Sequence, residues 1–248
     1  MSKRWGSLVL LLSVALVPRA LAYRPFDQTD ADVAELHMLE LELGPLQFER
    51  SAGRTAYVPT FILNAGVLPG WELVIDTSGS GTVAGPREPG EVFDFEAGVA
   101  FKGVVRKGSL QDGEGPSIAV EPELLLPATA GPSGFGFAAG VIVSQRWPAL
   151  TLHVNLAHRP DRPLGRAHNL AGQVGFIAEG PDEWTVRPVG EVYVEAEHAV
   201  RGVTSSFLGG LIWRISPRVS TDAAVRVGTV SGVGLFEVRV GLTWDLPL

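Results

Sequence analysis

The sequence predicts an all-β protein: a closed antiparallel transmembrane β-barrel of about twelve strands connected in up-and-down order. Three observations predict this fold. Runs of roughly ten residues alternate in side-chain character, and glycine, proline or charged residues end them. After the first segment, no stretch is apolar for the length of a membrane helix, and no long segment keeps a helical period. The alternation sets an apolar face against a charged one, and in a barrel lipid covers the first while water and ion pairs cover the second.

The first residues have the layout of a secretory signal peptide. Lys3 and Arg4 form a basic end, Leu8–Val17 is a short apolar core, and Ala20-Leu21-Ala22 is a small-x-small cleavage site. We expect cleavage after Ala22, so that residues 1–22 are the signal peptide and 23–248 the barrel domain. An N-terminal anchor helix is the alternative, and without a cysteine after the cleavage site we do not expect a lipoprotein.

Charge and cysteine content exclude several classes of protein. Cleavage would remove three of the 20 basic residues and none of the 27 acidic ones, which leaves a formal charge of −10 on the mature chain. Acidity of this size argues against nucleic acid and against an anionic membrane surface as partners. The chain has no cysteine, so an exported fold must be held together by its sheet and not by disulfides.

Twelve alternating runs are the expected strands, an even number that places both chain ends on the periplasmic side. They are Leu36–Phe48, Ala56–Val67, Trp71–Thr77, Asp94–Val104, Ser117–Leu126, Phe135–Arg146, Leu150–His158, Asn169–Ala178, Thr185–Glu197, Val203–Ile215, Val219–Thr229 and Val233–Trp244. Six aromatic residues near the ends of these runs fit the interfacial girdles of a membrane barrel. They are Tyr57, Trp71, Trp147, Trp184, Trp213 and Trp244.

The connections alternate between tight turns and longer loops. Three tight proline turns (Leu68–Gly70, Trp147–Ala149, Ser216–Arg218) alternate with looser loops that begin at Ser78, Pro127 and Arg159. Short turns at the periplasmic rim and longer loops outside the cell are typical of outer-membrane barrels. One connection, Val105–Pro116, is long although it falls at the short-turn rim. The glycine-rich stretch from Thr77 to Gly85 lacks the lysine and following helix of a phosphate-binding loop, so we expect an outer loop there.

The alternation also predicts which charged side chains face the lumen. On the last strand Phe236, Val238 and Trp244 lie on one face, and Glu237 and Arg239 on the other. Candidate lumen-lining residues are Glu40, Glu42, Glu72, Glu96, Lys102, Glu121, Glu123, Arg146, Arg187, Glu191, Glu195, Arg214, Asp222, Arg226, Glu237 and Arg239. These charges could pair and fill the barrel, or line a polar conduit and set its selectivity, and both can hold together.

A soluble β-sandwich or lipocalin-like barrel is the alternative fold. In that fold the apolar faces of the strands would meet each other, and the charged side would face bulk water. The regular alternation over the whole chain and the lack of further apolar residues for an inner core favour the membrane barrel. A closed barrel also leaves no unpaired strand edge in lipid, where each unpaired backbone group costs several kcal/mol.

Several stretches resemble a family of bacterial outer-membrane proteins named for the MetA pathway of phenol degradation and described as transporter-like. The matching text is "LPGWEL" (Leu68–Leu73), "GEVFDFEAGVAFK" (Gly90–Lys102), "LLLPATAG" (Leu124–Gly131), "ISPRVSTDAAVRVG" (Ile215–Gly228) and "VRVGLTW" (Val238–Trp244). These stretches span most of the mature chain in the order found in the family. The resemblance implies a barrel and a role in the uptake of hydrophobic or aromatic compounds, and it carries no catalytic residue.

The residues that could support chemistry do not form a convincing site in the sequence. No two histidines have the i, i+2 spacing that would place them on one strand face, so we expect no metal site. Ser144, His153, Glu121 and Glu123 could be parts of a hydrolase, but any barrel with a polar interior offers such a set. We therefore expect no enzyme, no catalytic or cofactor-binding residue and no cofactor.

The leading function is passive transport or binding of a small, hydrophobic or aromatic compound. The alternatives are a structural barrel with a plugged lumen and an outer-membrane lipid-modifying enzyme. We expect outer-membrane lipid and the outer-membrane assembly machinery as partners, together with a small-molecule solute.

Overall fold

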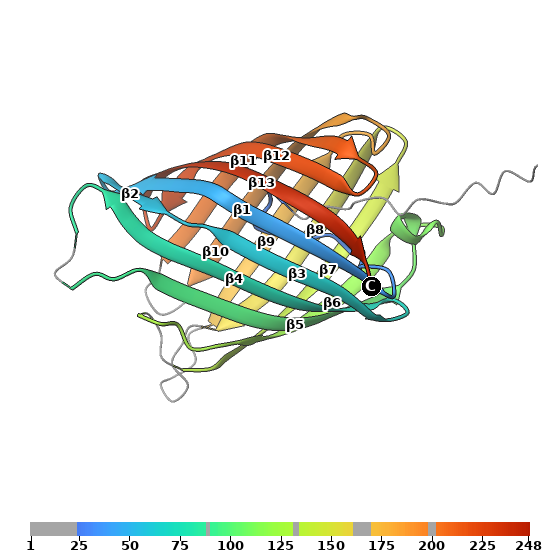
Figure 1. Cartoon of the computed structure of the whole chain (residues 1–248), viewed down its shortest axis with the longest axis horizontal. Helices are drawn as coiled ribbons and strands as arrows, with labels where there is room; N and C mark the ends of the chain where they lie inside the picture. The colour runs from blue at the N-terminus through green and yellow to red at the C-terminus, as the bar shows by residue number, and fades with distance from the viewer. Residues whose placement is uncertain (1–23, 88–89, 131–133, 161–169, 198–201) are drawn as a thin grey trace, which may run out of the picture.

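A single sheet closes on itself to form a barrel in the structure, a computed structural model that describes residues 24–87, 90–130, 134–160, 170–197 and 202–248 (Figure 1). The expected signal peptide lies outside these described residues. The elements are β1 (Met38–Ser51), β2 (Arg54–Tyr57), β3 (Thr60–Leu68), β4 (Trp71–Ala84), β5 (Asp94–Arg106), the 3-10 turn η1 (Ser109–Gln111), β6 (Ser117–Leu125), β7 (Gly136–Trp147), β8 (Leu150–Pro160), β9 (Leu170–Glu179), β10 (Val186–Glu197), β11 (Gly202–Ser216), β12 (Val219–Val230) and β13 (Val233–Pro247). Within the described residues no helix is long and apolar enough to cross a membrane.

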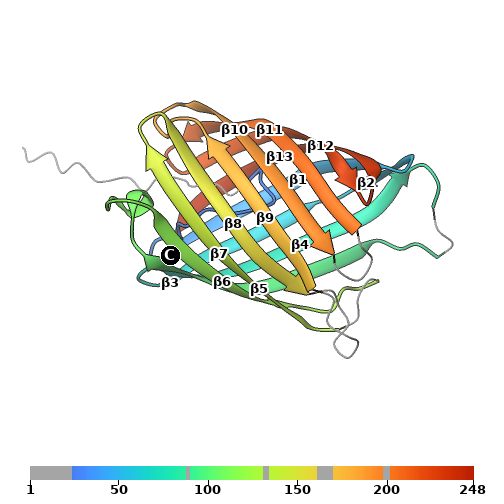
Figure 2. The same cartoon turned by 180° about the vertical axis from the view of Figure 1, so that it is seen from behind.

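The barrel has twelve strand positions, as the sequence predicted. Neighbours in the chain are neighbours in the sheet, and β1 closes the wall by pairing antiparallel with β13 from Met38↔Pro247 to Ser51↔Leu235. Both β2 and β3 pair with β1 on one side and β4 on the other, so the two segments share one position. The break between them contains Pro59, which has no N–H for the ladder. The predicted up-and-down antiparallel barrel is confirmed (Figure 2).

The two faces of the wall differ as the alternation predicted. On β13 the side chains of Glu237 and Arg239 are buried inside, whereas Phe236 and Trp244 point outward and are nearly half exposed. A soluble sandwich would bury the apolar face, yet here that face is the exposed one. The outer surface therefore has the character of a lipid-facing wall, and the charged residues lie inside.

Tryptophans form one aromatic girdle. We call the end where β1 begins and β13 ends the termini rim, and the opposite end the loop rim. All five tryptophans of the described chain lie near the termini rim. They are Trp71, Trp147, Trp184, Trp213 and Trp244. Such a ring is typical of the boundary between the hydrocarbon of a bilayer and water.

A second aromatic cluster lies near the loop rim, where the rings of Phe48, Tyr57, Phe93 and Phe95 contact one another with centroids 4.9–6.4 Å apart. On β13, Phe236 near the loop rim and Trp244 near the termini rim are separated by about 27 Å along the strand at 3.4 Å per residue. A strand tilt of about 40° reduces this to about 20 Å across the wall, near the height of the apolar band of an outer-membrane barrel.

The predicted contrast between the two rims holds only in part. Three proline turns at the termini rim are tight, and 85–93 and 126–135 are longer connections at the loop rim. The loop rim also has two-residue turns at Ala52-Gly53 and Ser231-Gly232, whose positive φ angles are typical of tight hairpins.

The glycine-rich stretch after Thr77 is mostly strand and not the outer loop that we expected. β4 continues to Ala84 and pairs with β5 as far as Ser80↔Asp94. A side chain on Gly79 or Gly81 would overlap the ring of Phe93, with 2.5 Å from an added Cβ to the nearest ring carbon. The glycines therefore admit an aromatic ring onto the strand, which is a packing role that composition alone does not separate from a loop.

Candidate functional site

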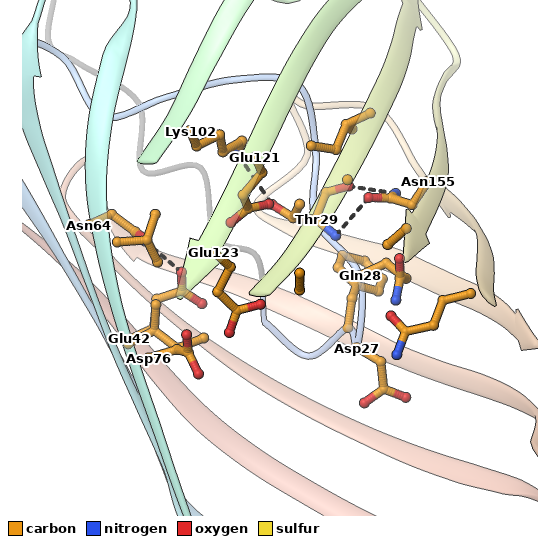
Figure 3. Close-up of a pocket in the computed structure, with 18 of the residues that line it drawn as sticks. Asp27, Gln28, Thr29, Glu42, Asn64, Asp76, Lys102, Glu121, Glu123 and Asn155 are labelled. Carbon is orange, nitrogen blue, oxygen red and sulfur yellow. Dashed lines mark hydrogen bonds between the residues drawn. The ribbon is translucent and has the colours of Figure 1, made fainter. Parts of the chain in front are cut away.

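The chain before β1 lies inside the barrel. We call residues 24–37 the lumen segment. It leaves the wall at the start of β1 and crosses the interior, where its residues Asp27, Gln28 and Thr29 border a cavity (Figure 3). The sequence predicted a strand from Leu36, whereas β1 begins at Met38. No other expectation fell on this segment, because the residues before Leu36 carry no strand or helix period.

Arg24 fixes one end of the lumen segment against the wall near β1 and β12. Its backbone N–H donates to Glu42 at 3.1 Å, its guanidinium donates to Thr60 at 2.5 Å, and its Nε lies 3.4 Å from an Asp222 oxygen. The arginine is 5% exposed. A buried cation with charged and polar partners on several strands ties this end to the wall.

The middle of the lumen segment is bound by side chains from the far strands. Glu191 of β10 accepts the backbone N–H groups of Asp27 and Gln28, both at 2.9 Å. Arg239 donates to the Pro25 carbonyl at 2.7 Å and to Asp27 at 2.5 Å, and Arg226 also pairs with Asp27. Burial acts to raise the pKa of Asp27, but the charges of Arg239 and Arg226 outweigh it and hold the pKa below its ordinary value.

The side chain of Asn155 forms hydrogen bonds with the backbone of the lumen segment at Thr29. Asn155 of β8 donates to the Thr29 carbonyl at 2.8 Å and accepts from the Thr29 N–H at 3.4 Å. This two-point contact copies the pairing of neighbouring strands. Nearby, Lys102 lies within 3.5 Å of both Asp30 and Glu72, so a lysine of β5 joins the segment to β4.

The connection from β5 to β6 is long because it covers the lumen segment. Gln111 of η1 donates to the Ala31 carbonyl and to Asp32, both at 3.0 Å. Leu110 packs with Ala31 in a small buried cluster. Burial and then the Asp30 carboxylate raise the pKa of Asp32 to about 6, against the hydrogen bond from Gln111. The connection from β5 to β6, which departs from the short turns of the termini rim, thus provides residues that contact the lumen segment.

Inward glycines make room for the lumen segment. An added Cβ on Gly66 would lie 2.0 Å from the carbonyl oxygen of Glu35, and one on Gly175 would lie 2.3 Å from the Gln28 side chain. Gly44 and Gly241 lie against the Arg24 guanidinium in the same way. Glycines at lumen-facing positions are the sequence signal that could have pointed to an inserted segment.

A polar cluster closes part of the termini rim beside the segment. Asp182, in the connection between β9 and β10, pairs with Arg146 at 3.1 Å and also with Arg187. Its carbonyl accepts a hydrogen bond from Arg214 at 2.7 Å, and Arg187 pairs with Glu179 at 3.0 Å. These contacts join β7, β9, β10 and β11 across the interior of the barrel.

A cavity of about 310 Å³ lies on the loop-rim side of the lumen segment. On β7 the cavity is lined by Ala138, whereas the lumen segment contacts Ser144, which lies nearer the termini rim. On β9 the cavity is lined by Gln173, whereas the polar cluster at the rim contains Glu179. Six carboxylates and three cations line it. These are Asp27, Glu42, Glu72, Asp76, Glu121 and Glu123, with Arg24, Lys102 and Arg239.

The lining of the cavity has a formal excess of three negative charges. Each of its three cations also contacts an acid outside the lining: Arg24 contacts Asp222, Lys102 contacts Asp30 and Arg239 contacts Glu237. Figure 3 shows Glu42, Asp76, Glu121 and Glu123 together on one side, with Thr29 and Asn155 on the other. Carboxylates of the barrel wall therefore gather on one side of the cavity, and the lumen segment, with Asp27, Gln28 and Thr29, lies on the other.

The predicted lumen-lining residues fall into three groups in the structure. Glu42, Glu72, Lys102, Glu121, Glu123 and Arg239 line the cavity. Glu40, Arg187, Glu191, Asp222 and Glu237 are buried, and Arg226 is 13% exposed beside Glu237. The remaining four candidates are less buried but occupy inward-facing positions of their strands: Glu96, Arg146, Glu195 and Arg214. Four further residues at inward-facing positions were not among the predicted candidates: Asn64, Asp76, Asn155 and Glu179. The alternation of β8 had already placed Asn155 on its polar face.

The four residues considered as parts of a hydrolase lie in two different places. Ser144 and His153 touch at 2.7 Å, whereas Glu121 and Glu123 line the cavity. The carboxylate beside His153 is instead Glu179, at 2.9 Å. Among the residues that the structure describes, no group of three or more histidine, cysteine or carboxylate side chains could hold a metal ion.

No family model matches the chain, and no curated protein matches it. Solved structures do match its fold. The NanC porin aligns with a TM-score of 0.61 and 10% identity over 83% of this chain and 100% of that chain. The COG4313 outer membrane channel from Pseudomonas putida F1 gives 0.60 and 7% identity over 89% and 100%, and the KdgM porin 0.53 and 10% over 83% and 98%. At these identities the similarity shows the fold alone, that of an outer-membrane channel barrel.

Proposed function

We propose that the chain is an outer-membrane channel that lets small polar solutes cross passively, and that the lumen segment narrows its path. The observation that carries the proposal is a charged lumen with a cavity of about 310 Å³ inside a wall whose outer face is apolar. Lipid would cover that face, with the outer-membrane assembly machinery inserting the barrel. The structural similarity to channel barrels also supports a channel function.

The acidic lining favours cations and neutral polar solutes over anions. A second hollow of about 610 Å³ near the loop rim is lined by Glu49, Glu91 and Asp94 against one cation, Arg54. A solute entering there would meet a negative potential before it reached the inner cavity. The resemblance to the phenol-degradation family implies hydrophobic or aromatic solutes. The lining combines charged and amide groups with apolar side chains such as Phe26, Ile62 and Val74, and its excess of acids favours polar solutes.

Flux into liposomes tests the proposal. Purified barrel in vesicles should speed the entry of small amines and neutral sugars relative to empty vesicles, and small carboxylates should enter more slowly. Phenol uptake measured in parallel tests the family-based alternative. A heat-dependent shift in gel mobility of the outer-membrane fraction would report a closed barrel in that membrane, and a soluble protein without such a shift would contradict the proposal.

A structural barrel with a plugged lumen is the second candidate, and the many contacts of the lumen segment favour it. The two functions separate when the segment is displaced. If the chain is a channel, solute flux should be measurable in the wild type and should rise in a variant whose segment is displaced. If it is a structural barrel, the wild type should show no flux. The first result supports a conduit with an adjustable lumen, and absent flux in both proteins would support the plugged barrel.

A further inference from the structure

Three inward side chains on adjacent strands form a hydrogen-bonded chain near the termini rim. Ser144 of β7 and His153 of β8 are direct cross-strand partners, with 2.7 Å from the serine Oγ to the histidine Nδ1. The histidine Nε2 lies 2.9 Å from Glu179 of β9, and Arg187 holds the other oxygen of that carboxylate at 3.0 Å. Sheet register therefore places a hydroxyl, an imidazole and a carboxylate in line.

The contacts on either side of the imidazole are consistent with one direction of proton transfer. In the neutral imidazole that a general base requires, the proton on Nε2 faces Glu179, which is also paired with Arg187, and Nδ1 is the free lone pair. The Ser144 hydroxyl must then donate to Nδ1, which leaves an oxygen lone pair to accept the Ala31 N–H at 2.9 Å. A serine that donates to an imidazole oriented by a carboxylate is the arrangement that activates an oxygen nucleophile.

Ala31 lies beside Ser144, and its backbone N–H donates to the serine Oγ. Its carbonyl accepts a hydrogen bond from Gln111 at 3.0 Å. Its methyl group is fully buried in an apolar pocket made by Leu110, Ala119 and Ile142. A donor for a carbonyl oxygen, a small apolar pocket and an activated serine thus surround one residue of the lumen segment.

We propose that Ser144 and His153, positioned by Glu179, form a hydrolytic site for esters with a small acyl group, and that Ala31 occupies this site while the lumen segment is docked. The Ser144 oxygen would attack the ester carbonyl as its proton passes to His153 Nδ1. The alcohol would leave with that proton, giving an acyl-serine. Water would then attack the acyl carbon, lose a proton to Nδ1 and release the acid, and His153 would return the proton to Ser144.

Buried polar chains also anchor segments without any chemistry, so the test must read the reactivity of the serine and not only its contacts. A fluorophosphonate probe reacts with an activated serine and forms a covalent bond to its oxygen. The full-length barrel in detergent micelles is suitable for such labelling. The site lies under the docked segment, so the wild type should react slowly.

Two substitutions should uncover the site without changing Ser144, His153, Glu179 or Arg187. Ala31→Phe cannot fit the methyl-sized pocket, and Gly66→Ala acts on the segment from another strand, where an added Cβ would lie 2.0 Å from the Glu35 carbonyl. The chain has no cysteine, so Gln28→Cys added to each protein reports displacement by its reaction with a water-soluble maleimide. A heat-dependent gel shift shows that each variant is folded.

Displaced variants should be labelled at least tenfold faster than the wild type, and they should hydrolyse p-nitrophenyl acetate. Ser144→Ala should abolish both signals, and His153→Gln should lower them at least a hundredfold. Ser220→Ala, at a buried lumen-facing serine of β12, is the matched control and should change neither signal. Labelling should fall in Glu179→Ala and recover in Glu179→Gln, which keeps an acceptor for Nε2–H, at equal maleimide accessibility.

A folded variant in which the thiol introduced by Gln28→Cys is accessible and Ser144 is unreactive would overturn the proposal and leave the hydrogen-bonded chain as an anchor for the segment. Labelling that persists in Ser144→Ala would overturn it as well. Neither result depends on solute flux, so the channel proposal would stand or fall by its own measurement.

Discussion

Arg239 of β13 and Asp27 of the lumen segment are joined by an ion pair of 2.5 Å across 212 residues of sequence. Arg239 is 4% exposed and also contacts Glu237 of its own strand at 2.8 Å. The pair therefore ties the segment to the strand that closes the barrel. Because removal of Asp27 leaves the buried Arg239 with Glu237 as its remaining carboxylate partner and removes its bond to the segment, this contact should be a main determinant of docking.

Asp27→Asn should loosen the lumen segment and raise solute flux several-fold, because Arg239 and Arg226 lose a shared anion. Flux of a small amine into liposomes is the measurement. Asp112→Asn is the matched control: it removes the same charge at an exposed loop position with φ of 56°, which asparagine adopts readily. Equal flux in both variants would show that the pair does not hold the segment.

Gly66→Ala should displace the segment where it leaves the wall, because its Cβ would overlap backbone atoms of Ala34 and Glu35. Maleimide labelling of Gln28→Cys should rise several-fold. Gly172→Ala on β9 is the control, since an added Cβ there meets no atom of the described chain within 4 Å. Unchanged maleimide labelling in Gly66→Ala would mean that the strand, and not the segment, shifts to accommodate the added Cβ.

Docking of the segment should weaken as the pH rises from about 4 to about 6. The pKa of Asp32 is raised from 3.8 to about 6 in the docked state, so docking is strongest when Asp32 is protonated and loses this contribution as the carboxyl ionises. Asp32→Asn should remove the effect. Both proteins carry Gln28→Cys, and the ratio of their maleimide labelling, taken at pH 4.5 and 7, cancels the pH dependence of the thiol. A constant ratio would contradict the assignment.

Phe207→Arg should destabilise the barrel by about 2–4 kcal/mol, the cost of a cation on the lipid face of a membrane barrel. Phe207 lies near the middle of β11, and 54% of its surface is exposed on the outer wall. Urea unfolding in lipid vesicles measures the change, with Glu114→Arg in an exposed loop as control. A neutral or stabilising effect would mean that water and not lipid covers this face.

Glu121→Gln combined with Glu123→Gln should lower the preference of the channel for cations. Both side chains line the acidic wall of the cavity, and their loss removes two of its six carboxylates. The reversal potential under a salt gradient in planar bilayers gives the permeability ratio. Glu114→Gln, outside the lumen, should leave that ratio unchanged. A ratio insensitive to the double variant would place the solute path elsewhere.

The wall of the barrel could be predicted from the sequence because its cause is local. Side chains alternate along a strand, so Phe236 and Glu237 point to opposite faces whatever their distant neighbours are. The same rule assigned the inward parity of Glu42, Glu191 and Arg239. Glycine was the weak point: at Gly79 and Gly81 it admits the Phe93 ring into a strand, and composition could not tell that role from a loop.

The contents of the lumen were decided only by the tertiary structure. Residues 24–37 have no period of their own, and their place depends on groups from β1, β4, β5, β7, β8, β10 and β13 that closure of the barrel brings together. Ser144 and His153 were visible in the sequence as separate candidates, but the register of β7 against β8 set their 2.7 Å contact, and β9 supplied Glu179. Alternation along a strand is a property of the backbone, whereas contacts across a barrel depend on how many strands close it and in which register.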